Sequence, residues 1–452
     1  MFVESRHFGP GGRLSIAVVG SGISGLSAAW LLASRHQVTV FEAEARPGGH
    51  SLTVETGATA PAPVDMGFIV YNEETYPNLA ALFAALRIPT APSEMSFAVS
   101  LDDGRLEYSG TDLGGLVAQK RNLVSPRFWA MLADLIRFYR QAPRETAGLG
   151  LVSLNDYLDS RGYGRAFRED HLYPMAAAIW SAPPGKVGDY PAAAFASFCA
   201  NHGLLKLSGR PLWRTVVGGS KVYVGALCER FREGLRLRSP VRRIRRGFNC
   251  AYLVAGDGEE RYDAVVIATH ADEALRLLAD PSAEERRLLG AFSYSRNLAV
   301  LHADDRLMPR RREVWSSWNY LGRRGREGAP ASATYWMNRL QSLPEAPLRF
   351  VTLNPFCAPR PELVIEQRVF HHPIFDAPAI AAQDELWSLQ GRRGTWFCGA
   401  YFGAGFHEDG LQAGLAVAES VGGVRRPWRV GEESGRIKIH ADHRLGAVEV
   451  AT

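Results

Sequence analysis

The chain has 452 residues, of which 46% are hydrophobic and 22% charged, and its formal net charge is +5. That length exceeds one small hydrophobic core, so we expect two joined domains of an ordinary globular protein. No apolar run reaches the roughly 18 residues of a membrane-spanning helix, and the first residues, which lack the apolar core of a secretory signal, are expected to form a short leader. Five dispersed cysteines without CxxC spacing favour reduced thiols in the cytoplasm and predict no metal site.

The small excess of positive charge comes from arginine, because the chain contains only five lysines. Two arginine-rich stretches, RRIRR at 242–246 and PRRRE at 309–313, are expected to be solvated faces. The alternative is contact with the anionic surface of a membrane. We predict no nucleic-acid partner.

The first predicted element is an apolar strand at 14–19, followed directly by GSGISG at 20–25. This stretch matches the GxGxxG pattern of dinucleotide-binding folds. Gly20 permits the tight turn, Gly22 lets the backbone approach a pyrophosphate, and Gly25 lets the next helix pack close to the strand. The helix N-terminus directs free N–H groups and the positive end of its dipole at the bound anion.

A second predicted strand, QVTVFE at 37–42, ends in an acid. Glu42 lies 42 − 20 = 22 residues after Gly20, close to the spacing of about 20 residues at which an acid holds a ribose 2′-OH. An acid there favours NAD or FAD over a 2′-phosphorylated cofactor. The following stretch, AEARPGGHS at 43–51, contains Arg46, which can pair with a diphosphate, and a glycine pair that can lie against a flat ring.

Two later stretches extend the predicted cofactor site. VDMGFIVYN at 64–72 places Gly67 inside a strand-like run, which indicates the close approach of a ligand. The sequence from 395 to 421 predicts a strand, a glycine turn and a helix that begins near Gly410 and offers a second anion site. Because this strand completes a site that begins near residue 17, the cofactor domain is predicted to be discontinuous.

The motifs GSGISGL, FEAEARPGGH and GAYFGAGFHEDGLQAG resemble the FAD-binding elements of the flavin amine oxidase superfamily, which includes phytoene desaturase-like enzymes. VDMGFIVYNEETYPNLAALFAAL, IWSAPP, NHGLL, LAVLHAD, TYWMNRLQSL and VTLNP are similar to a bacterial subgroup of predicted NAD/FAD-binding proteins, associated with genes for cyclopropane and methyl-branched fatty acids. The resemblance spans about 14–425. It implies an α/β, amine oxidase-like fold in which a Rossmann-like (GR2-type) FAD-binding domain is interleaved with an α+β substrate domain.

Glycine and proline punctuation divides the chain accordingly. We assign 13–75, 215–270 and 391–425 to the FAD-binding domain, 76–214 and 271–390 to the substrate-binding domain, and 426–452 to a C-terminal tail. The stretch from 76 to 214 is expected to be mainly helical.

The resemblance implies FAD as the cofactor, and we expect non-covalent binding although His50 is a candidate for a covalent link. The residues implied around the ribose and diphosphate are Gly20, Ser21, Gly22, Ile23, Ser24, Gly25, Glu42, Ala43 and Arg46. Those implied around the ring, the ribityl chain and the adenine are Gly48, Gly49, His50, Gly67, Phe68, Val241, Ala268 and Thr269. Those implied to close over the cofactor are Gly399, Ala400, His407, Glu408, Asp409 and Gly410.

The sequence does not single out catalytic side chains, because a flavin performs the electron chemistry itself. Tyr401, which follows the implied flavin contact, is one candidate, and His202 and His270 are candidate acid–base groups. Aromatic walls suit a long apolar substrate. The predicted pocket aromatics are Tyr71, Trp180, Tyr335, Trp336, Tyr401 and Phe402.

One departure from the family pattern bears on the reaction. Amine oxidases of the superfamily commonly carry a lysine that holds a water near the flavin. The matching strand here, YSRNLAVLHAD at 294–304, has no lysine, and the position falls near Arg296 or Asn297. This difference disfavours amine oxidation and leaves the FAD assignment unchanged.

The resemblance therefore implies an FAD-dependent oxidoreductase that removes hydride from long-chain unsaturated or methyl-branched fatty acyl lipids, with O2 as the acceptor. Three alternatives stay open: a fatty acid double-bond isomerase without net redox change, a flavin-binding accessory protein of a lipid methyltransferase, and an amine oxidase. We expect a cytoplasmic protein, with surface contact to a membrane as an open alternative.

Overall fold

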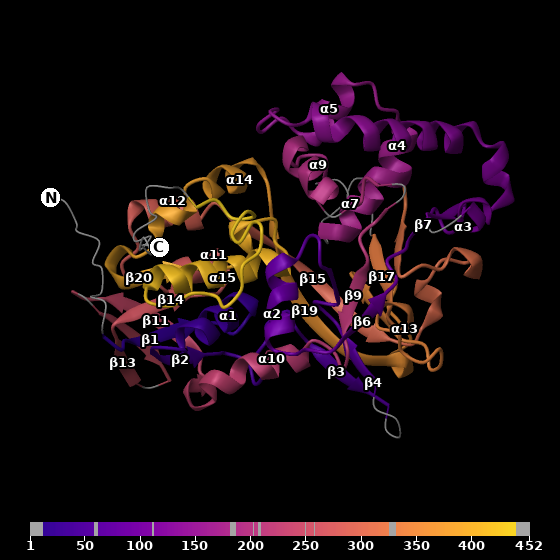
Figure 1. Cartoon of the computed structure of the whole chain (residues 1–452). Coiled ribbons are helices and arrows are strands. Elements are labelled where there is room, and N and C mark those ends of the chain that lie inside the picture. Colours follow the sequence, from indigo (N-terminus) through magenta and orange to yellow (C-terminus); the bar gives the residue numbers. More distant parts are fainter. Residues whose placement is uncertain are drawn as a thin grey trace.

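The structure is a computed structural model that describes residues 12–57, 62–110, 113–180, 187–201, 203–206, 209–248, 250–256, 258–324 and 331–439. Figure 1 shows a parallel sheet with its helices at the left and a larger mixed sheet at the right. A separate group of helices covers the top of the larger sheet. This group is α4 (Pro126–Glu145), α5 (Leu154–Ser160), α7 (Tyr173–Trp180) and α9 (Ala192–Asn201).

The left-hand sheet has five parallel strands in the order β10-β2-β1-β14-β20. These are β1 (Ser15–Val19), β2 (Gln37–Phe41), β10 (Leu235–Arg236), β14 (Ala264–Ile267) and β20 (Thr395–Phe397). Most of their side chains are buried and apolar, as in a parallel sheet covered on both faces. Strands from all three sequence segments assigned to the cofactor domain therefore share this one sheet.

Two helices start at the carboxyl edge of this sheet, where ligands bind in folds of this kind. Helix α1 (Ile23–Leu32) follows β1, and α15 (His407–Val421) follows β20 by way of a short turn. Helix α15 begins three residues before the predicted start at Gly410. Both helices are largely buried and pack on each other.

The right-hand sheet has seven strands in the order β19-β15-β18-β17-β16-β7-β8. They are β7 (Phe97–Leu101), β8 (Leu106–Ser109), β15 (Ser293–His302), β16 (Trp318–Gly322), β17 (Ser332–Trp336), β18 (Phe350–Leu353) and β19 (Val364–Ile374). The stretch from 76 to 214, predicted to be mainly helical, thus also supplies β7 and β8 to this sheet.

The remaining elements join and cover the two sheets. The other strands are β3 (Thr53–Thr56), β4 (Ala62–Asp65), β5 (Val70–Asn72), β6 (Thr90–Ser93), β9 (Trp213–Val216), β11 (Val241–Arg246), β12 (Ala251–Ala255) and β13 (Gly258–Tyr262). The other helices are α2 (Pro77–Ala85), α3 (Leu113–Val117), α6 (Arg165–Phe167), α10 (Lys221–Cys228), α11 (Ala271–Leu277), α12 (Ala283–Leu289), α13 (Met337–Leu340) and α14 (Ala377–Gln383).

The described part of the predicted C-terminal tail is packed against the body of the protein. Arg426 is 3% exposed and donates a hydrogen bond of 2.9 Å to Asn78. The ring of Trp428 stacks on Trp30, with centroids 6.0 Å apart. Residues 440–452 and residues 1–11, which make up most of the predicted leader, lie outside the described residues.

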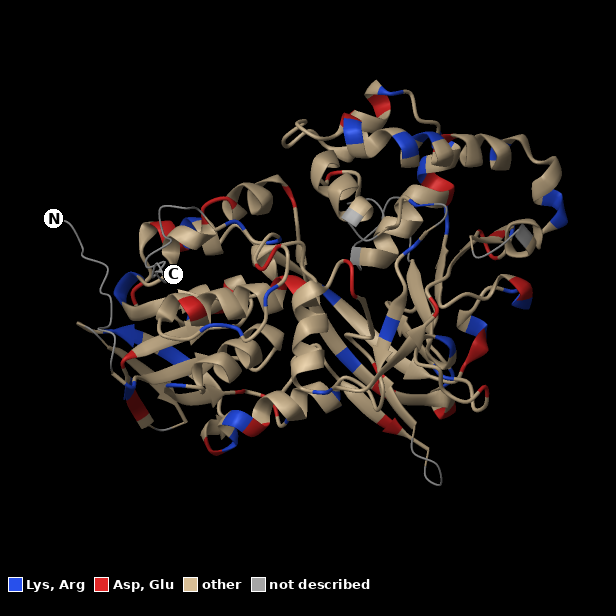
Figure 2. Cartoon of the chain, viewed as in Figure 1, with Lys and Arg blue, Asp and Glu red and all other residues tan. Residues whose placement is uncertain are grey.

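The arginine-rich stretch 242–246 forms β11, which Figure 2 shows as a blue strand at the left, and its arginines differ in environment. The buried side chain of Arg246 contacts two carboxylates, at 3.0 Å from Asp280 and in a short ion pair with buried Glu285. Arg245 is exposed and pairs with exposed Glu259 at 3.0 Å. The buried network supports the fold, whereas the exposed pair is screened by water.

We expect Arg246→Ala to lower the free energy of unfolding by about 3–5 kcal/mol, because it leaves a buried carboxylate without its partner. Arg245→Ala on the same strand is the matched control, with an expected loss below about 1 kcal/mol. Chemical denaturation of both variants measures the difference, and equal losses would contradict this account of the network.

Candidate active site

A cavity of about 1010 Å³ extends from the carboxyl edge of the parallel sheet to the face of the seven-stranded sheet. We call the part lined by the loops after β1, β2, β14 and β20 the dinucleotide half. The part lined by α7, α9, β7, β16 and β17 is called the distal chamber. Its walls include Met95, Phe97, Met175, Phe198, Trp318 and Tyr335.

Most of the residues predicted for the cofactor line this cavity. They are Gly20, Ser21, Gly22, Ile23, Ser24, Glu42, Ala43, Arg46, Gly48, Gly49, His50, Gly67, Phe68, Val241, Ala268, Thr269, Gly399, Ala400 and His407. Tyr335, Tyr401 and His270 also line it.

Glu408 and Asp409 do not line the cavity, contrary to the prediction for these two carboxylates. Glu408 is buried and accepts hydrogen bonds from the backbone N–H groups of Asn78 and Leu79, at 3.0 and 2.9 Å, so it caps α2. Asp409 accepts a bond of 2.7 Å from the N–H of Phe406 at the start of its own helix. Both carboxylates fix helix ends that border the site.

Gly25 and Gly410 are also absent from the lining, because they lie where elements touch. A Cβ on Gly25 would overlap the carbonyl oxygen of Gly20, and one on Gly410 would lie 2.8 Å from Ser24 Oγ. These glycines therefore let α1 pack on β1 and on α15. They shape the wall without facing the cavity.

The predicted pair Tyr335 and Trp336 divides between two faces of β17, since consecutive strand residues point in opposite directions. Tyr335 lines the cavity, whereas Trp336 packs edge-on against Trp315 with ring centroids 5.5 Å apart. The side chain of Trp180 and all of His202 lie outside the described residues.

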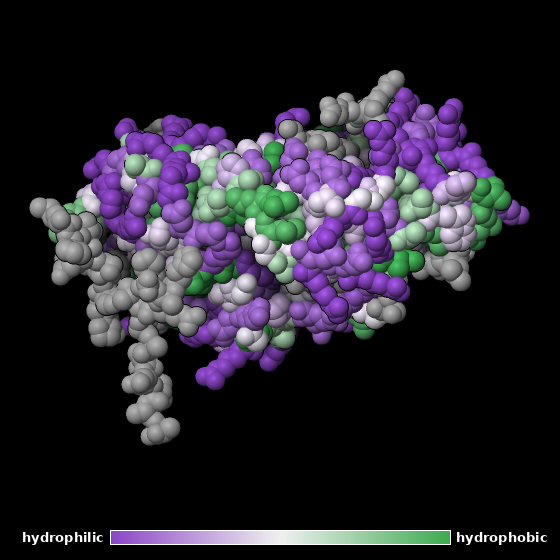
Figure 3. All heavy atoms as spheres, turned by 90° about the horizontal axis from the view of Figure 1, so that it is seen from above, coloured by the Kyte–Doolittle hydropathy of each residue, from purple (hydrophilic) through white to green (hydrophobic). Residues whose placement is uncertain are grey.

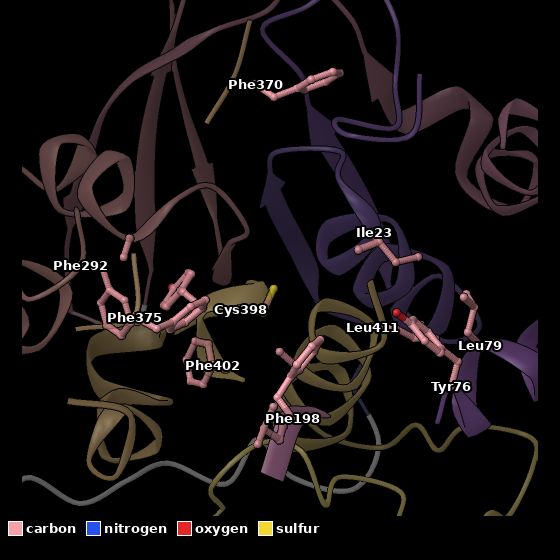
Figure 4. Close-up of a cluster of buried hydrophobic side chains, with 14 of the residues drawn as sticks. Ile23, Tyr76, Leu79, Phe198, Phe292, Phe370, Phe375, Cys398, Phe402 and Leu411 are labelled. Atoms are coloured by element: carbon pink, nitrogen blue, oxygen red, sulfur yellow. The ribbon is translucent and has the colours of Figure 1, made fainter. Parts of the chain in front are cut away.

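Tyr71 and Phe402 lie in the core instead of the cavity. The ring of Tyr71 meets Phe83 edge-on at 5.1 Å between centroids. Phe402 packs against Trp387, with centroids 6.3 Å apart, and Figure 4 shows it within a buried hydrophobic cluster. The short helical turn after β20 sends Tyr401 toward the cavity and its neighbour away from it.

Glu42 is held firmly at the end of β2. Its Oε2 accepts a hydrogen bond of 3.0 Å from the N–H of Ser21 in the glycine turn. Its Oε1 accepts one of 2.9 Å from the N–H of Glu44. The carboxylate is thereby oriented at the point where a ribose would lie in a dinucleotide-binding fold.

Arg46 orders the loop that carries the glycine pair. Its guanidinium donates to the carbonyl oxygens of Gly49 and Ser51, at 2.8 and 3.2 Å. Burial, followed by the charge of Arg368, lowers the pKa of Arg46. The positive charges of Arg46 and Arg368 repel each other, and an anion bound between them would relieve this repulsion.

Gly67 was predicted to allow the close approach of a ligand, but the group that lies close to it is the protein backbone at His50. A Cβ there would overlap the carbonyl group of His50, and the N–H of Phe68 donates to that carbonyl at 3.0 Å. The His50 ring lies 5.4 Å from the ring of His372, centroid to centroid. Burial lowers the pKa of His50 well below its usual value, so this side chain is neutral.

His407 at the start of α15 is fixed by two rings. It stacks on Phe68, with centroids 3.9 Å apart and planes inclined by 13°. Its Nε2 lies 2.6 Å from the hydroxyl of Tyr223, a residue that the sequence reasoning missed because α10 carries no recognisable motif. Burial lowers the pKa of His407 to about 3.

The distal chamber contains a hydrogen-bond relay that the sequence did not reveal. His171 lies in a π-turn (Arg168–Leu172), a distortion often found at functional sites. The Tyr108 hydroxyl donates to the Asp170 carbonyl at 2.8 Å and so accepts from His171 Nδ1 at 2.9 Å. Nε2 then accepts from the Tyr139 hydroxyl at 3.2 Å. Burial, followed by the charge of Arg210, lowers the pKa of His171 to about 4.

The strand that lacks the family's lysine carries a different polar pair. Asn297 Nδ2 donates to His372 Nδ1 at 2.8 Å, and Asn354 Nδ2 donates to Asn297 Oδ1 at 2.7 Å. Burial lowers the pKa of His372 to about 4. A neutral, oriented imidazole from β19 therefore borders the cavity beside this position.

Two buried polar atoms on the cavity wall have no hydrogen-bond partner within the described residues. They are the Tyr401 hydroxyl and the Trp318 indole Nε1. Buried polar groups are nearly always satisfied in proteins, so these two atoms are exceptions among the residues that border the cavity.

Comparison with known proteins places these features in context. A family model described as flavin containing amine oxidoreductase matches residues 23–314. The "Putative flavin-containing monoamine oxidase AofH" of Mycobacterium tuberculosis (strain CDC 1551 / Oshkosh) is 26% identical over 291 residues. This match covers 60% of each chain, so our chain spans about 60% of that relative's length.

Solved structures share the fold and confirm the predicted fold class. A fatty acid isomerase from P. acnes that produces CLA aligns over 90% of this chain and 98% of its own, with 14% identity and a TM-score of 0.65. Putrescine oxidase bound to putrescine aligns over 90% and 99%, with 15% identity and a TM-score of 0.65.

The described residues fit a flavin dinucleotide. Gly22 faces open space, since nothing lies within 4 Å of a Cβ built on it, and this leaves the backbone accessible to a pyrophosphate. Arg46 and Arg368 supply positive charge, and Glu42 is oriented for a ribose. The other end of the same cavity is aromatic, as a site for the ring and a substrate requires.

We expect the substitution Gly22→Ala to weaken cofactor binding without affecting folding. Gly22 has φ −68° and free space at its Cβ, so alanine fits the flavin-free chain and its stability should change by less than about 1 kcal/mol. FAD affinity should fall at least about tenfold, because the methyl group occupies the place of the pyrophosphate. Gly25→Ala is the contrasting variant, since its methyl group meets backbone and should lower stability by about 1–3 kcal/mol.

Thermal denaturation and FAD titration of the two glycine variants provide the measurement. Unchanged FAD affinity in Gly22→Ala would contradict the assignment of this turn to the cofactor.

His171 makes stability depend on pH. Its folded pKa of about 4 lies below the ordinary value of 6.5, so its contribution is complete above pH 6.5 and is lost as the pH falls toward 4. We expect His171→Gln to reduce the slope of unfolding free energy in this window by up to about 1.4 kcal/mol per pH unit. Tyr139→Phe keeps the imidazole and should keep the slope, and identical slopes for wild type and His171→Gln would refute the assignment.

Proposed function

We propose, starting from the fact that this chain belongs to the family of flavin-containing amine oxidoreductases, that its substrates are long-chain unsaturated or methyl-branched fatty acyl lipids. The proposal is supported by the distal chamber, whose walls are apolar and aromatic. Such walls suit an extended hydrocarbon.

The charge of the distal chamber is the observation that carries this proposal. The carboxylates of the described cavity lining, Glu42, Glu44 and Glu273, all follow strands β2 and β14 of the parallel sheet, in the dinucleotide half. The permanent charge nearest to His171 of the distal chamber is that of Arg210. An amine substrate enters as a cation and would find no counter-charge there. Together with the missing lysine near Asn297, this argues against amines as substrates.

Arg210 supplies the anchor for the polar end of the lipid. Its Nε donates to the carbonyl of Lys206 at 2.9 Å, while the exposed guanidinium remains part of the cavity lining. A carboxylate or phosphate paired with it would place the acyl chain along the aromatic wall. Arg210 thus orients the substrate.

The chemistry then divides between cofactor and protein. When bound, FAD would supply the electron chemistry, as acceptor of a hydride from the lipid and donor of electrons to O2. The protein excludes water with the apolar chamber and holds its histidines neutral. Tyr139 can pass its hydroxyl proton to His171 Nε2 while taking one from the substrate, since the relay already has that direction.

A double-bond isomerase is the second candidate. The same relay that takes a proton from the lipid can return it, and the fold is shared with a fatty acid isomerase. The hydride would also return to the lipid, at another carbon, so the reaction would cause no net change in the oxidation state of the flavin. A flavin-binding accessory protein would bind lipid in the same chamber without converting it.

Anaerobic mixing of the flavin-loaded protein with an unsaturated fatty acid tests the proposal. We expect the visible flavin absorbance to bleach and to return when O2 is admitted, with an oxidised lipid found by mass spectrometry. A product with a shifted double bond and no bleaching would establish the isomerase. Bleaching by putrescine and not by lipid would refute lipid oxidation.

Arg210→Gln sharpens the test. We expect KM for the free acid to rise about tenfold with kcat little changed, because one charged contact to the substrate is lost. The methyl ester is the matched substrate control, and its KM should not respond. Equal effects on acid and ester would exclude Arg210 as the anchor.

A further inference from the structure

The helical end of the molecule exposes apolar side chains that do not serve the cavity. Leu123, Val124, Trp129 and Ile136 are 44%, 82%, 53% and 38% exposed. Figure 3 shows hydrophobic side chains at the right-hand end of the molecule, over the segment that leads into α4. We call these four residues, with exposed Ala133, the apolar patch.

The patch is built rigidly. It begins in a 3-10 turn (Lys120–Val124) that runs directly into α4, where the Ser125 hydroxyl caps the helix and Pro126 occupies the first turn. The indole N–H of Trp129 donates to the carbonyl of Leu123 at 2.8 Å. This bond ties the turn to the helix and fixes the orientation of the Trp129 indole.

Helix α4 has apolar residues on both faces at this end. Its inner face packs through Phe128, Met131, Leu135 and Phe138. Trp129, Ala133 and Ile136 follow one another at helical spacing on the outer face. A surface helix normally presents polar residues there, and an apolar outer face indicates contact with another molecule.

The charges around the patch favour an anionic partner. Lys120, Arg121 and Arg140 are exposed and form no ion pair within the described residues, and Figure 2 shows the ribbon coloured blue at the turn before α4. The nearby acids are already paired, Glu169 and Asp170 with Arg127 at 2.8 and 2.7 Å, and Asp134 with Arg137 at 2.9 Å.

A second cavity, of about 260 Å³, adjoins the patch. Val124 belongs to both. Four arginines line the cavity: Arg127 and Arg324 pair with Asp170, whereas Arg105 and Arg121 form no ion pair within the described residues. Asp170, also in its wall, directly precedes His171 of the distal chamber. The patch therefore lies on the side of the molecule that contains the distal chamber.

The two arginine-rich stretches expected from the sequence are less suited to a membrane. In 242–246, Arg245 and Arg246 pair with acids. In 309–313, Arg311 pairs with buried Glu107 at 2.7 Å. The other arginines of the two stretches are exposed, but neither stretch contains an exposed large apolar side chain that could enter the bilayer boundary.

We infer that the apolar patch docks the protein on the surface of a membrane that contains anionic phospholipids. The apolar side chains enter the boundary between headgroups and acyl chains, the cations lie among the headgroups, and the arginine-lined cavity receives a headgroup phosphate. Among the described residues no helix is long and apolar enough to cross a membrane, and docking at the surface needs none. This inference goes beyond the proposed reaction and does not depend on it.

Sedimentation of the full-length, flavin-loaded protein with vesicles tests the inference. We expect binding to vesicles of phosphatidylcholine mixed with phosphatidylglycerol, weak binding to phosphatidylcholine alone, and loss of binding at high salt. The double variant Val124→Asp/Trp129→Ala should bind at least about tenfold more weakly. Lys120→Ala/Arg121→Ala should weaken binding to the mixed vesicles about tenfold and leave flavin content unchanged.

Phe248→Asp is the matched control, because Phe248 is 88% exposed and follows β11, beside the parallel sheet. It should bind vesicles as the wild type does. Lipids brominated on their acyl chains give a second readout, since they should quench the fluorescence of wild type and not that of Trp129→Phe. No binding by the wild type, an undiminished patch variant, or an equal loss in Phe248→Asp would overturn the inference.

Discussion

The architecture depends on how closely α1 approaches β1 and α15. At Gly25 the helix backbone touches the carbonyl of Gly20, and at Gly414 there is no room for a side chain against Ser24. This approach brings the N-termini of α1 and α15 to one edge of the sheet, although hundreds of residues separate them in the sequence. Both helix dipoles then act on the same cavity, which is the electrostatic basis for holding a diphosphate.

One cavity combines two electrostatic environments. The dinucleotide half has arginines such as Arg46 and Arg368 and the oriented carboxylate of Glu42. The walls of the distal chamber are mainly apolar, and burial keeps His171 uncharged. An anionic cofactor can therefore lie beside positive charge while a hydrocarbon lies beside apolar side chains, end to end in the same cavity.

The first strands of the parallel sheet and the core of the dinucleotide turn were predictable because their signals are local, whereas the other cofactor residues were implied by the family resemblance. The turn at Gly20 and the acid at Glu42 follow from spacing within one strand-helix-strand unit. The distal chamber was not predictable in this way, since Tyr108 and His171 come from separate elements and meet only after packing. A motif also does not reveal which way a side chain points. Glu408 belongs to the motif that was expected to close over the cofactor, but its buried carboxylate caps α2.

The pairing of β20 beside β14 has a consequence for biosynthesis. During synthesis β1 leaves the ribosome early, and β20 follows hundreds of residues later. Until β20 pairs with β14, the parallel sheet lacks this edge strand and the cofactor groove is open on that side. A dinucleotide captured by the early segments would remain in contact with water until the last strand docks. Enclosure of the coenzyme is accordingly a late step of folding, and apolar surface of the unfinished groove needs protection from aggregation until then.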